Sequence, residues 1–234
     1  MGQKKLQRFA AIKSFPNVLE YPQNMKGQWK SFFHNNHPVI LELACGKGEY
    51  AVGLGRMHPE KNFIGIDIKG NRMWVGAKTA LDEGLVNVAF VRTQIEKITD
   101  YFAEGEVAEI WITFPDPQLR VSKAKKRLTH PRFLRLYQQI TGGSGIINLK
   151  TDSPDLYSFT KNVVNLFNLP LLMNMDDIHA ETEVKNELKI KTHYEKLDIA
   201  RSNRIHYLQF SLNKTFPADA EEQLKQLLIE QEAD

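Results

Sequence analysis

The chain has 234 residues, with 42% hydrophobic and 25% charged residues, which are ordinary values for a globular α/β domain with a sizeable core. No apolar run approaches the ~20 residues that a membrane-spanning helix needs, and no long apolar stretch follows the charged N-terminus as in a secretory signal. A single cysteine, Cys45, excludes an internal disulfide framework, and the histidines show no zinc-type spacing. We therefore expect a cytoplasmic protein that associates with no membrane and binds no metal ion.

The net charge of +3 conceals an uneven distribution of basic residues. Residues 1–30 hold six Lys/Arg against one acid, and residues 115–135 hold seven against Asp116 alone, so the rest of the chain is acidic. Concentrated basic charge is typical of surfaces that meet phosphate backbones. A solvated loop would explain either run alone, but two runs on an otherwise acidic chain favour a polyanionic partner.

Residues 1–36 lack clear periodicity and contain the breakers Pro16, Pro22 and Gly27. We predict a basic N-terminal arm or irregular cap over residues 1–36, with one short helix near residues 27–33. A single domain is expected over residues 37–234.

From residue 39 onward, apolar strand-like runs alternate with helical patterns. Strands are predicted at about 39–44, 62–68, 87–92, 108–114 and 145–150, and helices at 49–57, 71–83, 131–140 and 154–168. Two further strands, 171–175 and 204–212, precede an acidic amphipathic helix at 218–232. This alternation predicts an α/β fold with a doubly wound, mostly parallel seven-stranded sheet and an antiparallel final strand.

The first predicted strand ends in an acid, Glu42, and a tight glycine loop, Gly46-x-Gly48. Asp67 closes the next strand, nineteen residues after Gly48. Glycines let a backbone approach a ligand, and an acid at the second strand suits ribose hydroxyls. Ala51 stands where a dinucleotide site has its third glycine, which disfavours a nicotinamide-dependent oxidoreductase. A carboxylate beside the loop suits a cationic ligand without phosphate, such as S-adenosylmethionine.

Polar side chains stand at the ends of all five central strands. In chain order they are Glu42, Asp67, Gln94 and Glu96, Asp116, and Asp152. A structural role could account for any one of them, such as a rigid turn at Asp116. Because ligands of open α/β sheets lie beyond the carboxyl ends of the strands, the whole set predicts a ligand crevice.

Two short segments stand out beyond the glycine loop. Phe114-Pro-Asp-Pro117 is stiff, because each proline fixes its own φ and restricts the preceding residue. It holds Asp116 beside the second basic run. This arrangement suggests that Asp116 binds a nucleobase through hydrogen bonds while the basic residues bind phosphates nearby. Thr192-His-Tyr-Glu195 also fits the helix capping box, and its spacing alone favours capping.

The motifs together resemble one family. Glu42-Leu-Ala-Cys-Gly-Lys-Gly48 is similar to the cofactor loop of Rossmann-like class I methyltransferases, which use S-adenosylmethionine. Phe114-Pro-Asp-Pro117 followed by Lys125-Lys-Arg-Leu128, then Leu149-Lys-Thr-Asp152 and Thr192-His-Tyr-Glu195, resemble the bacterial tRNA (guanine-N7)-methyltransferases. The resemblance runs from about Val39 to Phe210 and implies methylation of a guanosine in the tRNA variable loop.

The resemblance implies roles for individual residues. Cofactor contacts fall on Glu42, Gly46, Gly48, Asp67, Gln94 and Asp116; Asp116, an acidic side chain in the active site, is also the catalytic residue. Substrate contacts fall on Arg120, Asp152, Thr192, Tyr194 and Glu195, and tRNA phosphate contacts on Lys123, Lys125, Lys126 and Arg127.

This chain departs from the family pattern at three places. Gln94 replaces an acid expected near the adenine, so either Gln94 or Glu96 would meet the adenine. Gln118 replaces a tryptophan, which leaves a stacking role unfilled, and Arg120 replaces a lysine with a forked cation that can make the same contact.

The alternatives are a class I methyltransferase acting on a small molecule or another RNA, and a non-catalytic RNA-binding subunit of the same fold. Two basic runs disfavour a small substrate, and the intact acids disfavour a non-catalytic subunit. The sequence leaves open a monomer or a homodimer.

Overall fold

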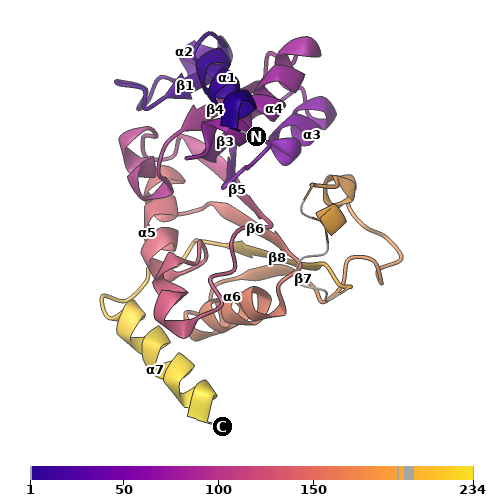
Figure 1. Ribbon diagram of the computed structural model, residues 1–234. Helices are drawn as coiled ribbons and strands as arrows, with labels where there is room; N and C mark the ends of the chain where they lie inside the picture. The colour runs from indigo at the N-terminus through magenta and orange to yellow at the C-terminus, as the bar shows by residue number, and fades with distance from the viewer. Residues whose placement is uncertain (1, 194, 198–202, 234) are drawn as a thin grey trace.

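The computed structural model describes residues 2–193, 195–197 and 203–233. Within this part of the chain, eight strands form one sheet in the order β1-β4-β3-β2-β5-β6-β8-β7 (Figure 1). The strands are β1 Val18–Glu20, β2 Val39–Leu43, β3 Asn62–Asp67, β4 Val88–Arg92, β5 Val107–Thr113, β6 Ile146–Thr151, β7 Leu171–Met175 and β8 His206–Ser211.

Neighbouring strands from β1 to β6 pair in parallel, whereas β8 is antiparallel to both β6 and β7. The predicted α/β class, the parallel sheet and the antiparallel end are therefore confirmed. The predicted number of seven strands is wrong, because β1 adds an eighth strand beside β4. With three residues, β1 is too short to show an alternating pattern in the sequence.

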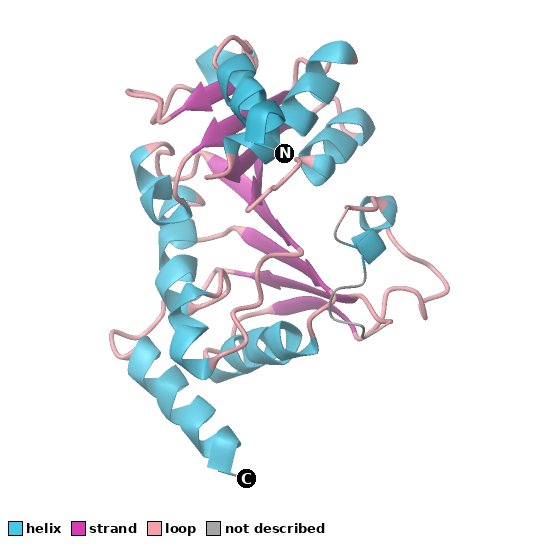
Figure 2. Cartoon of the chain, viewed as in Figure 1, coloured by secondary structure: helices cyan, strands magenta, loops and turns pink. Residues whose placement is uncertain are grey.

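Helices cover both faces of the sheet (Figure 2). They are α1 Gly2–Ile12, α2 Trp29–Phe33, α3 Glu49–Met57, α4 Gly70–Asp82, α5 Pro131–Ile140, α6 Pro154–Leu166 and α7 Ala220–Ala233. Short 3-10 helices lie at η1 Ile95–Asp100, η2 Val121–Lys126, η3 Asn186–Lys189 and η4 Glu195–Leu197. None of these helices is long and apolar enough to cross a bilayer.

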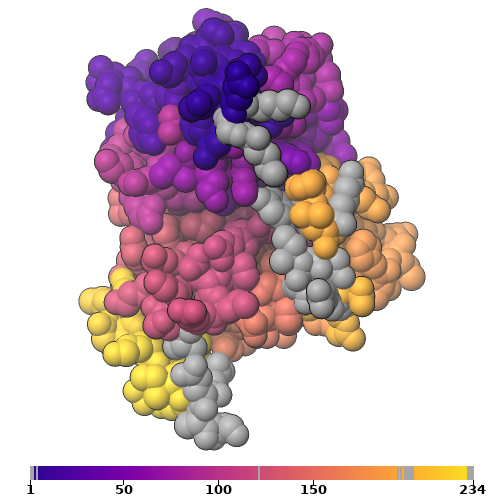
Figure 3. All heavy atoms as spheres, viewed as in Figure 1, coloured from indigo at the N-terminus to yellow at the C-terminus, as the bar shows by residue number. Residues whose placement is uncertain are grey.

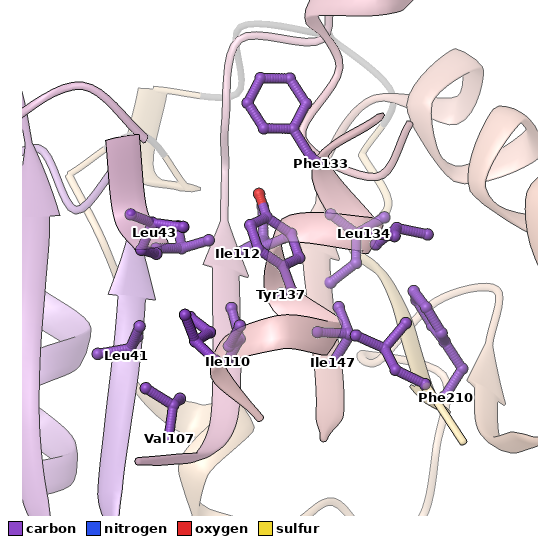
Figure 4. Close-up of a cluster of buried hydrophobic side chains, with 14 of the residues drawn as sticks. Leu41, Leu43, Val107, Ile110, Ile112, Phe133, Leu134, Tyr137, Ile147 and Phe210 are labelled. Atoms are coloured by element: carbon purple, nitrogen blue, oxygen red, sulfur yellow. The ribbon is translucent and has the colours of Figure 1, made fainter. Parts of the chain in front are cut away.

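Side-chain alternation along the strands divides the core into two layers. Leu41 and Leu43 of β2 pack with Ile110 and Ile112 of β5 under helix α5, whose Tyr137 is fully buried (Figure 4). The intervening residues face the opposite layer, where Trp111 of β5 lies beside Tyr50 of α3 with ring centroids 5.3 Å apart. The second layer is the one that carries the glycine loop.

Residues 2–33 are more regular than the irregular cap that we expected. Helix α1 packs on α4, with Ile12 fully buried and the Arg8 guanidinium 4.7 Å from the centre of the Trp74 ring. The buried Trp29 of α2 donates from its indole nitrogen to the Tyr101 carbonyl at 2.9 Å. The short helix expected near residues 27–33 is confirmed as α2, whereas α1, which is stabilised by its packing on α4, was not expected. The division of the chain at residue 36 stays a prediction.

Candidate active site

The parallel register brings the carboxyl ends of the central strands to one edge of the sheet. Leu43 of β2 is paired with Ile66 of β3 on one side and with Ile112 of β5 on the other. The ladder continues from Thr113 of β5 to Lys150 of β6. The segments that follow these strands therefore meet, as expected for the ligand crevice of an open α/β sheet.

The glycine loop leaves β2 through left-handed backbone conformations. The φ angles are +54° at Ala44, +54° at Gly46 and +69° at Gly48. Such a value is unusual for alanine and costs of the order of 1 kcal/mol. Asp67 fastens the loop, because one of its carboxylate oxygens accepts from Gly46 N at 2.9 Å and the other from Lys69 N at 2.8 Å. Asp67 is thus at the predicted cofactor edge, and it also shapes the loop.

Three glycines make room for the ring of Phe90 behind the loop. An added Cβ would lie 2.3 Å from a Phe90 ring carbon at Gly48, 2.7 Å at Gly65 and 2.9 Å at Gly76. At Gly76 it would also lie 2.4 Å from the Lys47 carbonyl oxygen. Helix α4 therefore approaches the glycine loop backbone to backbone, and Phe90 fills the remaining space.

Glu42 is buried beneath the N-terminus of α3, with 3% of its surface exposed. Its carboxylate accepts from Ala51 N at 2.8 Å and from the Thr113 hydroxyl at 3.2 Å. Burial raises the pKa of the Glu42 carboxyl to about 8, although these hydrogen bonds lower it. No ion pair to Glu42 is found among the described residues, so a cationic ligand group nearby would supply the missing counter-charge.

Asp116 lies on an exposed turn directly beyond β5. Phe114 begins the turn with φ +47°, and its N–H donates to the Lys150 carbonyl at 2.8 Å. The Asp116 carboxylate accepts from Gln118 N at 3.1 Å, and Gln118 itself has φ +50°. Two left-handed residues within five positions indicate a turn held in a demanding conformation, as is common at functional sites.

Arg127 is not a surface cation, so the expected phosphate contact needs correction. Its side chain is buried, with 4% exposed, and its guanidinium donates to the carbonyls of Pro117, Gln118 and Leu119 at 3.1–3.3 Å. The guanidinium also lies 4.5 Å above the ring centre of Phe159. Because its donors point at the turn, Arg127 holds the backbone next to Asp116. Sequence alone does not distinguish this residue from its exposed neighbours.

The Thr192–Glu195 segment makes the capping contact that its spacing suggests. The Thr192 hydroxyl accepts from Glu195 N at 3.1 Å. The Glu195 carboxylate accepts from the Lys150 ammonium at 2.9 Å. Tyr194, which the resemblance implies as a substrate contact, lies outside the described residues.

The remaining predicted site residues lie beyond the ends of strands β4, β5 and β6. Gln94 is exposed at the end of β4, and Asp152 is half-buried after β6. Glu96 points toward α5, where its carboxylate lies 3.8 Å from the Arg132 guanidinium; its position favours Gln94 for the strand-end contact. Arg120 is exposed at the start of η2.

The exposed cations of η2 form a basic surface beside the Asp116 turn. Lys123, Lys125 and Lys126 all belong to this helix and are exposed. The Lys125 ammonium lies 3.5 Å from the Glu221 carboxylate of α7. Figure 3 shows the start of helix α7 in yellow, next to the pink central part of the chain.

Sequence reasoning missed Lys150 and Thr113 as site residues. Lys150 was part of a quoted motif, but a lysine in a predicted buried strand was itself a signal, because lysine is almost never fully buried unless it is paired. Thr113 carried no such signal, because its bond to Glu42 depends on the register between β2 and β5.

The strand order, the glycine loop and the acids beyond the strand ends define a class I methyltransferase fold. A solved structure of a mutant 16S rRNA (adenine(1408)-N(1))-methyltransferase with cosubstrate SAM, from Catenulisporales acidiphilia, has a similar fold. Its TM-score is 0.57 at 13% identity, and the match covers 82% of this chain and 92% of that chain.

Sequence comparisons identify the family to which this chain belongs within the class I methyltransferases. A family described as "Putative methyltransferase" matches residues 36–208. A tRNA (guanine-N(7)-)-methyltransferase from Porphyromonas gingivalis is 52% identical over 215 residues, covering 87% of each chain. One from Bacteroides thetaiotaomicron is 48% identical over 221 residues, covering 91% of this chain and 87% of its own. The chain belongs to the tRNA (guanine-N7)-methyltransferase family and is a methyltransferase.

Proposed function

We propose that the enzyme transfers a methyl group from S-adenosylmethionine to N7 of a guanosine in the tRNA variable loop. The observation that carries this proposal is one edge of the sheet at which the glycine loop, Glu42, Asp67 and the Asp116 turn converge beside an exposed basic helix. The names of the close relatives supply the reaction and the substrate.

The residues at this edge fit the proposed cofactor. The left-handed glycine loop exposes backbone for close approach, and Asp67 stands where ribose hydroxyls are bound in this fold. Glu42 is a buried carboxylate whose pKa is raised by desolvation, and no ion pair to it occurs in the part of the chain that the structure describes, which suits a ligand that carries an ammonium group. When bound, S-adenosylmethionine supplies an electrophilic methyl group on a sulfonium. The solved neighbour that contains SAM has the same fold.

The proposed methyl transfer requires no proton transfer by a protein side chain before the attack. Guanine N7 has a free lone pair, so the attack needs no general base. The guanine becomes cationic as the methyl arrives, and we assign to Asp116 an acceptor contact with the guanine N–H edge that stabilises this charge. Orientation of the reacting atoms can supply roughly 7–11 kcal/mol of the barrier reduction. The hydrogen bond from Gln118 N restricts the carboxylate before the substrate arrives.

The direct test uses purified protein, labelled methyl donor and an unmodified tRNA transcript with a guanosine in its variable loop. We expect label in that nucleotide and loss of labelling when the guanosine is changed to adenosine. Labelling of ribosomal RNA or small molecules in place of tRNA would select another substrate class. Cofactor binding without any methyl transfer would indicate the non-catalytic alternative.

The role of Asp116 makes a separate prediction. Asp116→Asn keeps the shape of the side chain but removes the charge, so turnover should fall about 100-fold or more, while cofactor affinity should fall far less. Single-turnover methylation and calorimetry measure the two quantities. Asp82→Asn, on the exposed surface of α4, is the matched control. Full turnover by Asp116→Asn would remove Asp116 from catalysis.

A further inference from the structure

Lys150 is a lysine inside the sheet with no exposed surface. Its ammonium donates to the Leu188 carbonyl at 2.9 Å, to the Ile190 carbonyl at 3.0 Å and to the Glu195 carboxylate at 2.9 Å. An ammonium has three N–H donors, so all of them are used. All three acceptors belong to one segment, 38 to 45 residues further along the chain.

The surroundings of the ammonium are built for a cation. It lies 5.4 Å from the centre of the Tyr50 ring and 5.6 Å from that of Phe114, within the range of cation–π attraction. Burial lowers the pKa of Lys150, and the Glu195 carboxylate counteracts this shift. An apolar side chain at this point of the strand would avoid the desolvation of a buried ion pair, which often outweighs the attraction. Stability of the sheet therefore does not explain the lysine.

Lys150 connects two segments that carry proposed substrate contacts. Its backbone carbonyl accepts from Phe114 N at 2.8 Å at the start of the Asp116 turn. Its side chain fixes the segment that ends at Glu195. That segment belongs to the long connection between β7 and β8, which Figure 1 shows in orange, apart from helices α5 and α6. One further bond to it comes from Glu49 of α3, which accepts from His193 N at 3.0 Å.

We propose that Lys150 is a positioning residue that fixes residues 188–193 and Glu195 beside the end of β6 and thereby shapes the guanosine pocket. This inference rests on the proposed function for its effect on tRNA, but the mechanical part stands by itself. Lys150 acts through Glu195 and the two carbonyls and touches no reacting atom. Without it, the segment keeps the Glu49–His193 and Thr192–Glu195 bonds and the core packing of Leu188 but loses its three hydrogen bonds to β6.

The test compares Lys150→Met with Lys78→Met, which removes an exposed lysine of α4. Methionine keeps an unbranched apolar stem of similar length and lacks the ammonium. For Lys150→Met we expect amide hydrogen exchange in residues 186–193 to become at least about tenfold faster, with β2 and β3 unchanged. The KM for tRNA should rise about tenfold, and the Kd for S-adenosylmethionine should stay within about twofold. Lys78→Met should match wild type in all three.

Unchanged exchange in residues 186–193, or an unchanged KM, would overturn the proposal. Equal losses of cofactor and tRNA binding would also overturn it, because they indicate a general structural role. If Lys150→Met does not unfold cooperatively, Glu195→Ala decides, because it removes one of the three bonds to Lys150 and keeps the two carbonyl bonds; exchange should then become faster at Thr192 and His193 but not at Leu188. Wild-type exchange rates at Thr192 and His193 would refute the positioning role. If wild type does not methylate tRNA, the proposed function fails while the exchange data still judge Lys150.

Discussion

Glu42 and Lys150 are ionisable residues buried in the same layer, under helix α3. Glu42 is 3% exposed and Lys150 has no exposed surface. Burial shifts their pKa values in opposite directions, upward for the carboxyl and downward for the ammonium. Shifted pKa values cluster at functional sites because they require burial that structure alone rarely favours. By contrast, the proposed catalytic Asp116 is exposed, as suits a group that meets a large substrate from solvent.

Glu42→Gln should make stability less dependent on pH. The pKa of Glu42 is about 8 in the folded protein against an ordinary value of 4.5. Between these values the folded state binds more protons than the unfolded state, so this contribution to stability is complete below about pH 4.5 and is lost as the pH rises through 8. As the pH rises from 5 to 8, the free energy of unfolding of the variant should therefore increase by about 3 kcal/mol relative to that of wild type.

Urea unfolding of both proteins at the two pH values measures this difference for Glu42→Gln. Glutamine can still accept from Ala51 N and donate to the Thr113 hydroxyl, so the packing is kept. Glu222→Gln, exposed on α7, controls for the loss of one acidic group. Parallel pH profiles for wild type and Glu42→Gln would show that Glu42 titrates normally.

Arg127→Gln distinguishes a residue that positions the turn from a phosphate contact. Loss of the hydrogen bonds to the three carbonyls should let the Asp116 turn move, and turnover should fall roughly tenfold to a hundredfold. The salt dependence of tRNA binding should not change, because the buried guanidinium meets no phosphate. Lys126→Gln, one residue earlier and exposed, should instead leave turnover nearly unchanged and flatten the salt dependence of tRNA binding. A flatter salt slope in Arg127→Gln would restore the phosphate role.

At the scale of elements, the close approach of α4 to the glycine loop decides the shape of the edge at which we propose that the cofactor binds. The contact depends on Gly76, since any Cβ there meets the Lys47 carbonyl, which is backbone and cannot turn aside. The loop is in addition fastened by Asp67 from β3. Two elements therefore determine a conformation that the loop sequence only permits.

Gly76→Ala should weaken cofactor binding. A Cβ 2.4 Å from the Lys47 oxygen forces the helix and loop apart, at a cost of about 1–3 kcal/mol, so the Kd for S-adenosylmethionine should rise about tenfold. Calorimetry measures the Kd, and thermal unfolding shows how much stability is lost. Lys78→Ala, on the same helix but exposed, is the control. Wild-type affinity in Gly76→Ala would mean that the loop conformation does not govern binding.

At the scale of the whole molecule, charge is arranged so that one basic helix flanks the proposed catalytic turn. Lys123, Lys125 and Lys126 project from η2, which directly follows that turn. The acidic start of α7 lies nearby, with Glu221 close to both Lys125 and Arg135. Such a surface orients a polyanion without reading its sequence.

Replacing Lys123, Lys125 and Lys126 together by glutamine should weaken tRNA binding and flatten its salt dependence. Each lost phosphate contact lowers the magnitude of the slope of log K against log salt by about 0.7–0.9, so the loss of three contacts should lower it by about 2–3. Binding titrations at several salt concentrations give the slope. Glutamine at Lys78, Lys214 and Lys225, all exposed, is a control of equal charge. If both triple variants change the slope equally, only net charge matters.

Much of the fold could be predicted because its signals are local. Apolar runs predicted the five central strands within about a residue, and Gly84, with φ +66°, follows α4 where the sequence predicts its end. Helix α1 and strand β1 were not predicted, because their stability comes from α4 and β4. In the site, Asp116 and the glycine loop could be located from their motifs, whereas the roles of Arg127 and Lys150 could not.

The sequence by itself determined where the strands, the left-handed glycines and the stiff Pro-Asp-Pro turn fall, because backbone preferences and apolar periodicity act between neighbours along the chain. Only the tertiary structure decided that Arg127 turns inward to the turn beside Asp116 and that Lys150 holds a segment about forty residues away. An ammonium or guanidinium pairs with whatever acceptors surround it after folding. Those acceptors are set by strand register and loop path, which no local pattern encodes.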